Sequence, residues 1–162
     1  MKLDVFTLFP EWFEWFLGQR HLRNALQRGA EIRFFNYRDT TPLGGGQVDD
    51  SPYGGGAGMV LRVDAVDAAL NAAYGESRQG RRVVLLAPSG RQFDDALASD
   101  LAAEPGLALL CGRYEGVDER VREHLVTDAV SVGPYVLSGD HARVREWRLE
   151  QSRQRGAGPS DG

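Results

Sequence analysis

The sequence predicts an α/β fold, with a mostly parallel sheet and helices on both faces. Residues 83–87 and 107–111 are continuous apolar runs, which are typical of strands covered by helices on both sides. Strand-like and helix-like segments alternate through the second half of the chain, and this alternation favours parallel strands joined by helices. Each predicted strand in that half is followed by a segment containing glycine or proline.

The first half of the chain begins with a predicted strand at residues 2–8. Pro10 suits the first turn of a helix, so a short helix is expected at 11–17, with Gly18 at its end. We interpret the four aromatic residues of this helix as core residues: Trp12, Phe13, Trp15 and Phe16. The next expected elements are a helix at 21–28, a strand at 31–37 and a helix from a cap at Asp64 to Tyr74.

The second half is predicted to repeat a strand, a loop and a helix three times. The expected strands are 83–87, 107–111 and 129–132, and the expected helices are 94–103, 117–125 and 141–154. Residues 156–162 are small and polar, so we expect a disordered tail there.

The loops of this repeat predict a binding site. In an open α/β sheet, ligands bind beyond the carboxyl ends of the strands, so residues 87–90, 112–116 and 132–139 should meet. Glycine lets backbone groups approach a ligand closely, although the same glycines could simply form tight turns. Tyr114 and Tyr135 would supply rings to an adenosine or nucleobase pocket.

A long predicted loop at residues 38–58 holds seven of the chain's 20 glycines. Loops of this length inside a compact domain are usually functional or disordered. We therefore interpret much of the glycine content as backbone shaped around a ligand.

Residue counts exclude several classes of enzyme. Lys2 is the only lysine, so P-loop nucleotide-binding proteins, pyridoxal enzymes and protein kinases are ruled out. Cys111 is the only cysteine, which argues against disulfides and cysteine zinc sites and fits a reducing, cytoplasmic setting. The three histidines are too scattered to suggest a metal site, and no segment reads as a signal peptide or membrane span.

The eighteen arginines allow two interpretations. Genomic base composition explains them simply, and phosphate contact is the functional alternative, because a guanidinium group binds phosphate in a bidentate way. The net charge of −4 argues against a protein coated with nucleic acid, but it leaves room for a local basic patch.

Four motifs closely resemble the bacterial tRNA (guanine-N1)-methyltransferases, a family of the SPOUT superfamily. The motifs are F-T-L-F-P (6–10), V-D-D-S-P-Y-G-G-G-A-G-M (48–59), C-G-R-Y-E-G-V-D-E-R-V (111–121) and S-V-G-P-Y-V-L-S-G (131–139). They occur in the family's order, and the resemblance extends from Lys2 to Gly139.

The resemblance implies a trefoil knot near the C-terminus, with S-adenosyl-L-methionine bound in it, and a homodimer. It implies methylation of guanine N1 at position 37 of tRNA, next to the anticodon. Carried over by position, the cofactor residues are Leu86, Pro88, Gly112, Tyr114, Glu115, Val132, Gly133, Pro134, Tyr135, Val136, Leu137 and Gly139.

The chain departs from the family pattern at three places. Pro134 stands where the family usually has aspartate, and Gly44–Gly46 replace a more basic stretch. After a cofactor-binding domain at 1–139, residues 140–155 resemble a helix late in the family's C-terminal tRNA-binding domain. We therefore expect a family chain that lacks an internal segment after Gly139. The arginines of the last helix suggest either a solvated surface or a stripe that contacts RNA phosphates.

The sequence leaves the catalytic residues unknown. The family assigns general-base and stabilising roles to an aspartate and an arginine in the segment without a counterpart, and no residue of this chain matches either by motif. Three functions stay open: a tRNA methyltransferase, a cofactor- or RNA-binding module without turnover, and a generic nucleotide-binding α/β domain.

Overall fold

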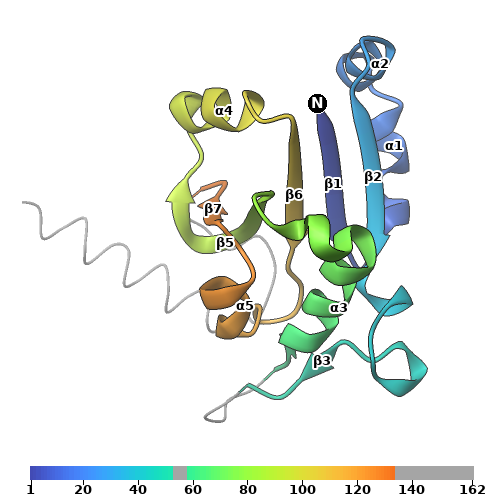
Figure 1. Ribbon diagram of the computed structural model, residues 1–162, viewed down its shortest axis with the longest axis vertical. Helices are drawn as coiled ribbons and strands as arrows, with labels where there is room; N and C mark the ends of the chain where they lie inside the picture. The colour runs from blue at the N-terminus through green and yellow to red at the C-terminus, as the bar shows by residue number, and fades with distance from the viewer. Residues whose placement is uncertain (53–57, 134–162) are drawn as a thin grey trace, which may run out of the picture.

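The computed structural model describes residues 1–52 and 58–133, and these residues form one main sheet (Figure 1). Its strand order is β2-β1-β6-β5-β7, and every neighbouring pair is parallel. The strands are β1 (Lys2–Thr7), β2 (Glu31–Asn36), β5 (Arg82–Gln92), β6 (Gly106–Cys111) and β7 (Asp128–Ser131). The prediction of a mostly parallel α/β sheet is confirmed.

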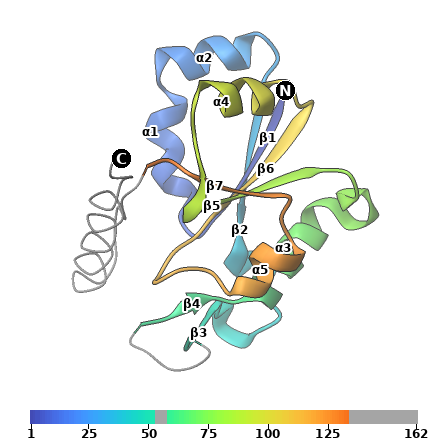
Figure 2. The same ribbon diagram turned by 90° about the vertical axis from the view of Figure 1, so that its left-hand side faces the viewer.

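Helices lie on both faces of the sheet (Figure 2). Alternate side chains of a strand point to opposite faces, so apolar strands need helices on each side to cover them. On one face, α3 (Val63–Tyr74) and α5 (Glu119–His124) share a core with Leu85. On the other face, α4 (Asp95–Ala102) packs on Val84 through Leu97 and Leu101. The short helices α1 (Glu14–Leu17) and α2 (Arg20–Gln27) follow β1.

Several elements differ in extent from the sequence predictions. Strand β5 continues through residues 88–90 to Gln92, with a register shift between Leu86 and Arg91. Helix α5 starts at Glu119 rather than at 117, because Val117 forms a bridge to Leu61 instead.

The predicted long loop also contains regular structure. Strand β3 (Asp49–Asp50) pairs in antiparallel fashion with β4 (Val60–Leu61). Helix α3 begins one residue before Asp64, with Arg62 at the N-cap position but without a side-chain capping bond. Asp64 therefore lies in the first turn instead of capping the helix, and both of its carboxylate oxygens accept hydrogen bonds from the Arg62 guanidinium group.

The interpretation of the four aromatic residues at positions 12–16 as core is wrong. Trp12, Trp15 and Phe16 are 58%, 70% and 41% exposed. Phe13 alone reaches the sheet, where its ring lies 5.1 Å from that of Phe34. The structure divides the predicted helix at 11–17 into a 3₁₀ segment, Pro10–Phe13, and α1. Among the described residues, Trp12, Trp15 and Phe16 form an open aromatic surface along these two segments.

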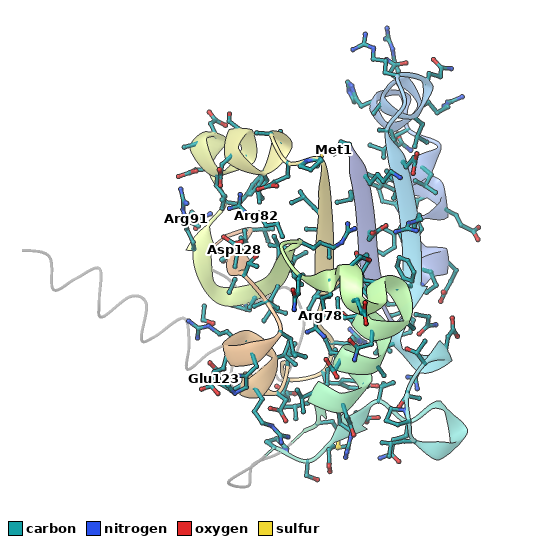
Figure 3. All side chains as sticks on the ribbon, viewed as in Figure 1. Met1, Arg78, Arg82, Arg91, Glu123 and Asp128 are labelled. Atoms are coloured by element: carbon teal, nitrogen blue, oxygen red, sulfur yellow. The ribbon has the colours of Figure 1, made fainter. Side chains whose placement is uncertain are left out.

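Two charged residues tie strands together at the amino end of the sheet. Buried Asp4 accepts hydrogen bonds from Arg33 at 2.7 and 2.8 Å and from the Tyr74 hydroxyl at 2.7 Å. Arg82 binds Asp128 through Nε at 3.0 Å and Asp100 at 2.7 Å, which joins β5 to β7 and to α4 (Figure 3). Both networks stabilise the sheet on which the candidate site is built.

Several predictions lie outside the described residues: the helix at 141–154, the tail at 156–162 and the trefoil knot. Among the helices that are described, none combines the length and apolar character that crossing a membrane requires.

Candidate functional site

The carboxyl ends of β6 and β7 lie beside Leu86, at the point where β5 shifts its register. Leu86 of β5 is paired in register with Cys111 of β6 on one side and with Val130 of β7 on the other. Gly112 directly follows Cys111 in the sequence, and Val132 lies two residues after Val130. The structure therefore places the start of each predicted segment in neighbouring strands, but residues 88–90 are part of β5 rather than a loop, and residues 134–139 lie outside the described residues.

Seven of the twelve predicted cofactor residues are described, and they have different degrees of exposure. Leu86, Tyr114 and Glu115 are half-buried, whereas Pro88, Gly112 and Val132 are exposed and Gly133 is buried. The other five lie outside the described residues: Pro134, Tyr135, Val136, Leu137 and Gly139. Among the seven that are described, Leu86, Pro88 and Val132 have apolar side chains and Glu115 carries the one carboxylate.

The loop G-R-Y-E-G, at residues 112–116, is held in place by Met59 and by strand β4, which follows Met59. The Glu115 N–H donates to the Met59 carbonyl at 3.0 Å, and the Leu61 N–H donates to the Gly116 carbonyl at 3.0 Å. Val60 also forms an antiparallel bridge to Tyr114. Two of the motifs that carry the family resemblance are therefore joined through backbone hydrogen bonds.

Gly58 sets the distance between these two segments. A Cβ atom at this position would overlap Glu115 Cγ and would lie 3.0 Å from Glu115 Cδ. The φ of Gly58 is also +96°, a backbone conformation that side chains disfavour. A glycine here lets the Glu115 side chain lie against the backbone of residue 58.

Ion pairs support the far side of the loop. Asp118 caps α5 by accepting from the Arg120 N–H, and the Arg120 guanidinium group holds the pKa of Asp118 below its usual value. Arg62 bridges Asp50 and Asp64 at 2.6 and 2.7 Å, and it lowers the pKa of Asp64. These residues border a small hollow of about 170 Å³.

This hollow does not coincide with the predicted pocket. A second hollow, of about 320 Å³, lies at the opposite edge of the sheet, beside Lys2, Arg82 and Gly106. Neither hollow is lined by the predicted cofactor residues. We therefore place the candidate site at the strand ends rather than at either hollow.

Cys111 stands at the end of β6, directly before the loop. Burial raises the pKa of its thiol to about 11, so the thiolate is scarce near neutral pH. This favours a packing role for Cys111 over nucleophilic chemistry. Among the described residues, no three histidine, cysteine, aspartate or glutamate side chains are grouped as metal ligands would be.

Comparison with known proteins identifies the family. Residues 1–139 match the family described as tRNA (Guanine-1)-methyltransferase. The chain belongs to this family. It is 47% identical over 140 residues to the tRNA (guanine-N(1)-)-methyltransferases of Bacillus cereus (strain AH820) and Bacillus anthracis (strain CDC 684 / NRRL 3495). These matches cover 86% of this chain and 57% of each relative, so the chain spans little more than half the length of these relatives.

The fold is also similar to that of a solved family structure. The tRNA (m1G37) methyltransferase from Aquifex aeolicus superposes with a TM-score of 0.75 at 31% sequence identity, covering 93% of this chain and 66% of that one. The resemblance read from the four motifs is therefore confirmed at the level of the family and of its α/β fold.

Sequence reasoning did not identify the residues that hold the family's G-R-Y-E-G loop in this chain. Met59 and Leu61 act through backbone groups, and the two-residue strand β4 has no periodicity that could reveal it. Gly58 lies in the glycine-rich motif at 48–59, but its contact with Glu115 depends on the tertiary fold and leaves no pattern in the sequence.

Proposed function

We propose that the carboxyl edge of β5, β6 and β7 binds S-adenosyl-L-methionine. The observation that carries this proposal is the shared register of Leu86 with Cys111 and Val130, which brings the register shift of β5 beside the carboxyl ends of β6 and β7. Ligands of open α/β sheets bind at such edges. The match of residues 1–139 to a methyltransferase family supports the same assignment.

The residues at this edge fit the chemistry of the cofactor. An adenosine moiety needs an apolar surface and nearby backbone polar groups, and half-buried Leu86 with exposed Val132 offers such a surface. A sulfonium ion is attracted to a carboxylate, which Glu115 can supply. When bound, S-adenosyl-L-methionine provides an electrophilic methyl group.

We further propose that the protein methylates guanine N1 at position 37 of tRNA, next to the anticodon. Family membership supports this reaction, and the Aquifex aeolicus relative is itself described as an m1G37 methyltransferase. Guanine N1 carries a proton, so a positioned general base is needed, which typically contributes about 10²–10⁴ to the rate. We assign that role to none of the described residues.

We also propose that two chains associate, as the family resemblance implies. The open aromatic surface of Trp12, Trp15 and Phe16 supports this, because large apolar side chains gathered on a surface commonly mark a contact. Sedimentation equilibrium should give twice the mass of one chain, and Trp15→Glu should shift the mass towards that of one chain. A single-chain mass before substitution would contradict the proposal.

Because the proposed substrate is a tRNA, we place the protein in the cytoplasm.

The second candidate function is binding of cofactor or RNA without methyl transfer. It is favoured by one observation: the match covers only 57% of the curated relatives. The family resemblance implies that the general base belongs to the segment that has no counterpart in this chain. Under this alternative, the strand-end site holds the cofactor while turnover is absent or weak.

A methyl-transfer assay distinguishes the two functions. The chain is incubated with S-adenosyl-L-methionine labelled on its methyl group and with an unmodified tRNA transcript that has guanosine at position 37. The methyltransferase proposal predicts label in this tRNA and none in a matched transcript with adenosine at position 37. Measurable cofactor binding without incorporation would establish the binding module instead.

A further inference from the structure

Arg38 connects three segments around the candidate site. It belongs to the 3₁₀ segment Tyr37–Asp39, and its N–H donates to Asn36 Oδ1 at 3.0 Å. Its Nη1 donates to the Gly46 carbonyl at 2.9 Å, and its Nη2 donates to the Tyr114 hydroxyl oxygen at 3.4 Å. One exposed guanidinium group therefore reaches the ring of a predicted cofactor residue that is 76 positions away.

Tyr114 has an unusual backbone. Its φ is 65°, and among the described residues it is the one non-glycine residue with a positive φ. Such a conformation is disfavoured for a residue with a Cβ atom, and it persists when the surroundings hold it in place. Residues of this kind are concentrated at functional sites.

The surroundings hold Tyr114 at both ends. The bridge to Val60 and the Glu115–Met59 hydrogen bond fix its backbone from the side of β4. Arg38 contacts the far end of the side chain, at the hydroxyl oxygen. Because a tyrosine ring fixed at both ends has fewer rotamers available, less conformational freedom is lost when a ligand binds against it.

We propose that Arg38 is a positioning residue for cofactor binding, acting through the Tyr114 hydroxyl. This inference rests on the proposed function, since it takes the Tyr114 ring as part of the cofactor pocket. Arg38 orients that ring before the cofactor arrives, and its second hydrogen bond, to Gly46, fixes the guanidinium group in turn. The cofactor loop is thus positioned by a residue from a separate part of the chain.

A double-mutant cycle tests whether Arg38 acts through Tyr114. Affinity for S-adenosylhomocysteine is measured by calorimetry for the unsubstituted chain, Arg38→Ala, Tyr114→Phe and the double variant. Each single substitution should weaken binding about two- to tenfold, the range expected for one hydrogen bond. The double variant should bind S-adenosylhomocysteine about as well as whichever single variant binds it less tightly, because the two single substitutions remove the same contact.

Three controls separate positioning from general structure. Arg23→Ala removes another exposed arginine, on α2, and should leave the affinity unchanged. Arg38→Lys keeps one cationic donor and should recover part of the lost affinity. Without ligand, the thermal unfolding midpoints of the Arg38 variants should stay close to that of the unsubstituted chain.

The outcomes distinguish this inference from the proposed function. Unchanged affinity in Arg38→Ala, or losses that multiply in the double variant, would overturn the role of Arg38 while leaving the cofactor site in place. Failure of the unsubstituted chain to bind S-adenosylhomocysteine would overturn the cofactor site itself, and the positioning role with it.

Discussion

Gly90 lies where β5 bends against β7, and replacing it with alanine tests how the strand-end site is built. A Cβ atom at this position would lie 2.5 Å from the Ala129 carbonyl carbon and 2.6 Å from the Ala129 oxygen. The φ of Gly90 is outside the left-handed region, so alanine would suit its backbone conformation. The cost of the substitution therefore comes from the close approach of the two strands.

The size of this effect follows from the contact distances. An ordinary van der Waals contact begins at 3.4 Å, so the Ala129 carbonyl carbon would have to move by 0.9 Å, and the Val130 nitrogen, which lies closer still, by more. Adding a methyl group to a packed site costs about 1–3 kcal/mol. The neighbours of Gly90 are backbone atoms of a paired strand and cannot rotate away, so we expect a cost of about 3 kcal/mol, at the upper end of that range. This corresponds to a fall of about 6–12 °C in the unfolding midpoint.

The assay compares Gly90→Ala with Gly44→Ala by thermal unfolding. A Cβ atom added at Gly44 would meet no described atom within 4 Å, and the φ of Gly44 is not positive, so its substitution should be neutral or slightly stabilising. Gly90→Ala should also weaken S-adenosylhomocysteine binding, because it displaces β7 beside Leu86. Equal unfolding midpoints for the two variants would refute the close packing of β5 on β7.

Three further predictions concern the charged and titratable groups. Arg82→Met should lower the free energy of unfolding in urea by about 2–3 kcal/mol, because the partly buried Asp128 loses its bidentate partner. Arg23→Met on α2 is the control and should have little effect. Equal losses in the two variants would contradict the role given to Arg82. Burial alone would raise the pKa of Asp4, but hydrogen bonds from Arg33 and Tyr74 outweigh it and lower the pKa below 3.8. The stability that Asp4 contributes is therefore present above about pH 4 and is lost as the pH falls through the lowered pKa. In urea unfolding, Asp4→Asn should therefore flatten the loss of stability as the pH falls below about 4, and an unchanged loss would contradict the role given to Asp4. Burial raises the pKa of Cys111 to about 11, so little thiolate is present at about pH 8. A disulfide reagent should therefore react at least about tenfold more slowly with the folded chain than with the chain in urea. Equal rates would argue against the raised pKa.

The sheet was predictable because its strands carry a strong apolar pattern. Residues 83–87 and 107–111 have continuous apolar runs, and both lie in buried, parallel strands. The extension of β5 to Gln92 was not predictable in this way, because Pro88 and Gly90 are typical of turns. The strand continues through them since the register shift opposite Val130 absorbs the irregular residues.

The neighbouring positions of Leu86, Cys111 and Val130 were predictable from the sequence, whereas the contacts that support the G-R-Y-E-G loop were not, and the binding role of this edge stays a prediction. The rule for open sheets and the family motifs both pointed to the strand ends, where Leu86, Cys111 and Val130 are now in register. The contact of Arg38 with Tyr114 depends on side chains brought together by the tertiary fold, which leave no local pattern. The exposed aromatic residues were misjudged because hydrophobicity alone does not distinguish a core from a surface that is open in a single chain.

Hydrogen exchange with and without S-adenosylhomocysteine tests the central claim most directly, because it locates the bound ligand along the chain. The strand-end site predicts added protection in the segments around residues 86–92, 112–116 and 131–139, and little change around Lys2, Arg82 and Gly106 at the opposite edge. Protection confined to that opposite edge, or no protection at saturating ligand, would contradict the site.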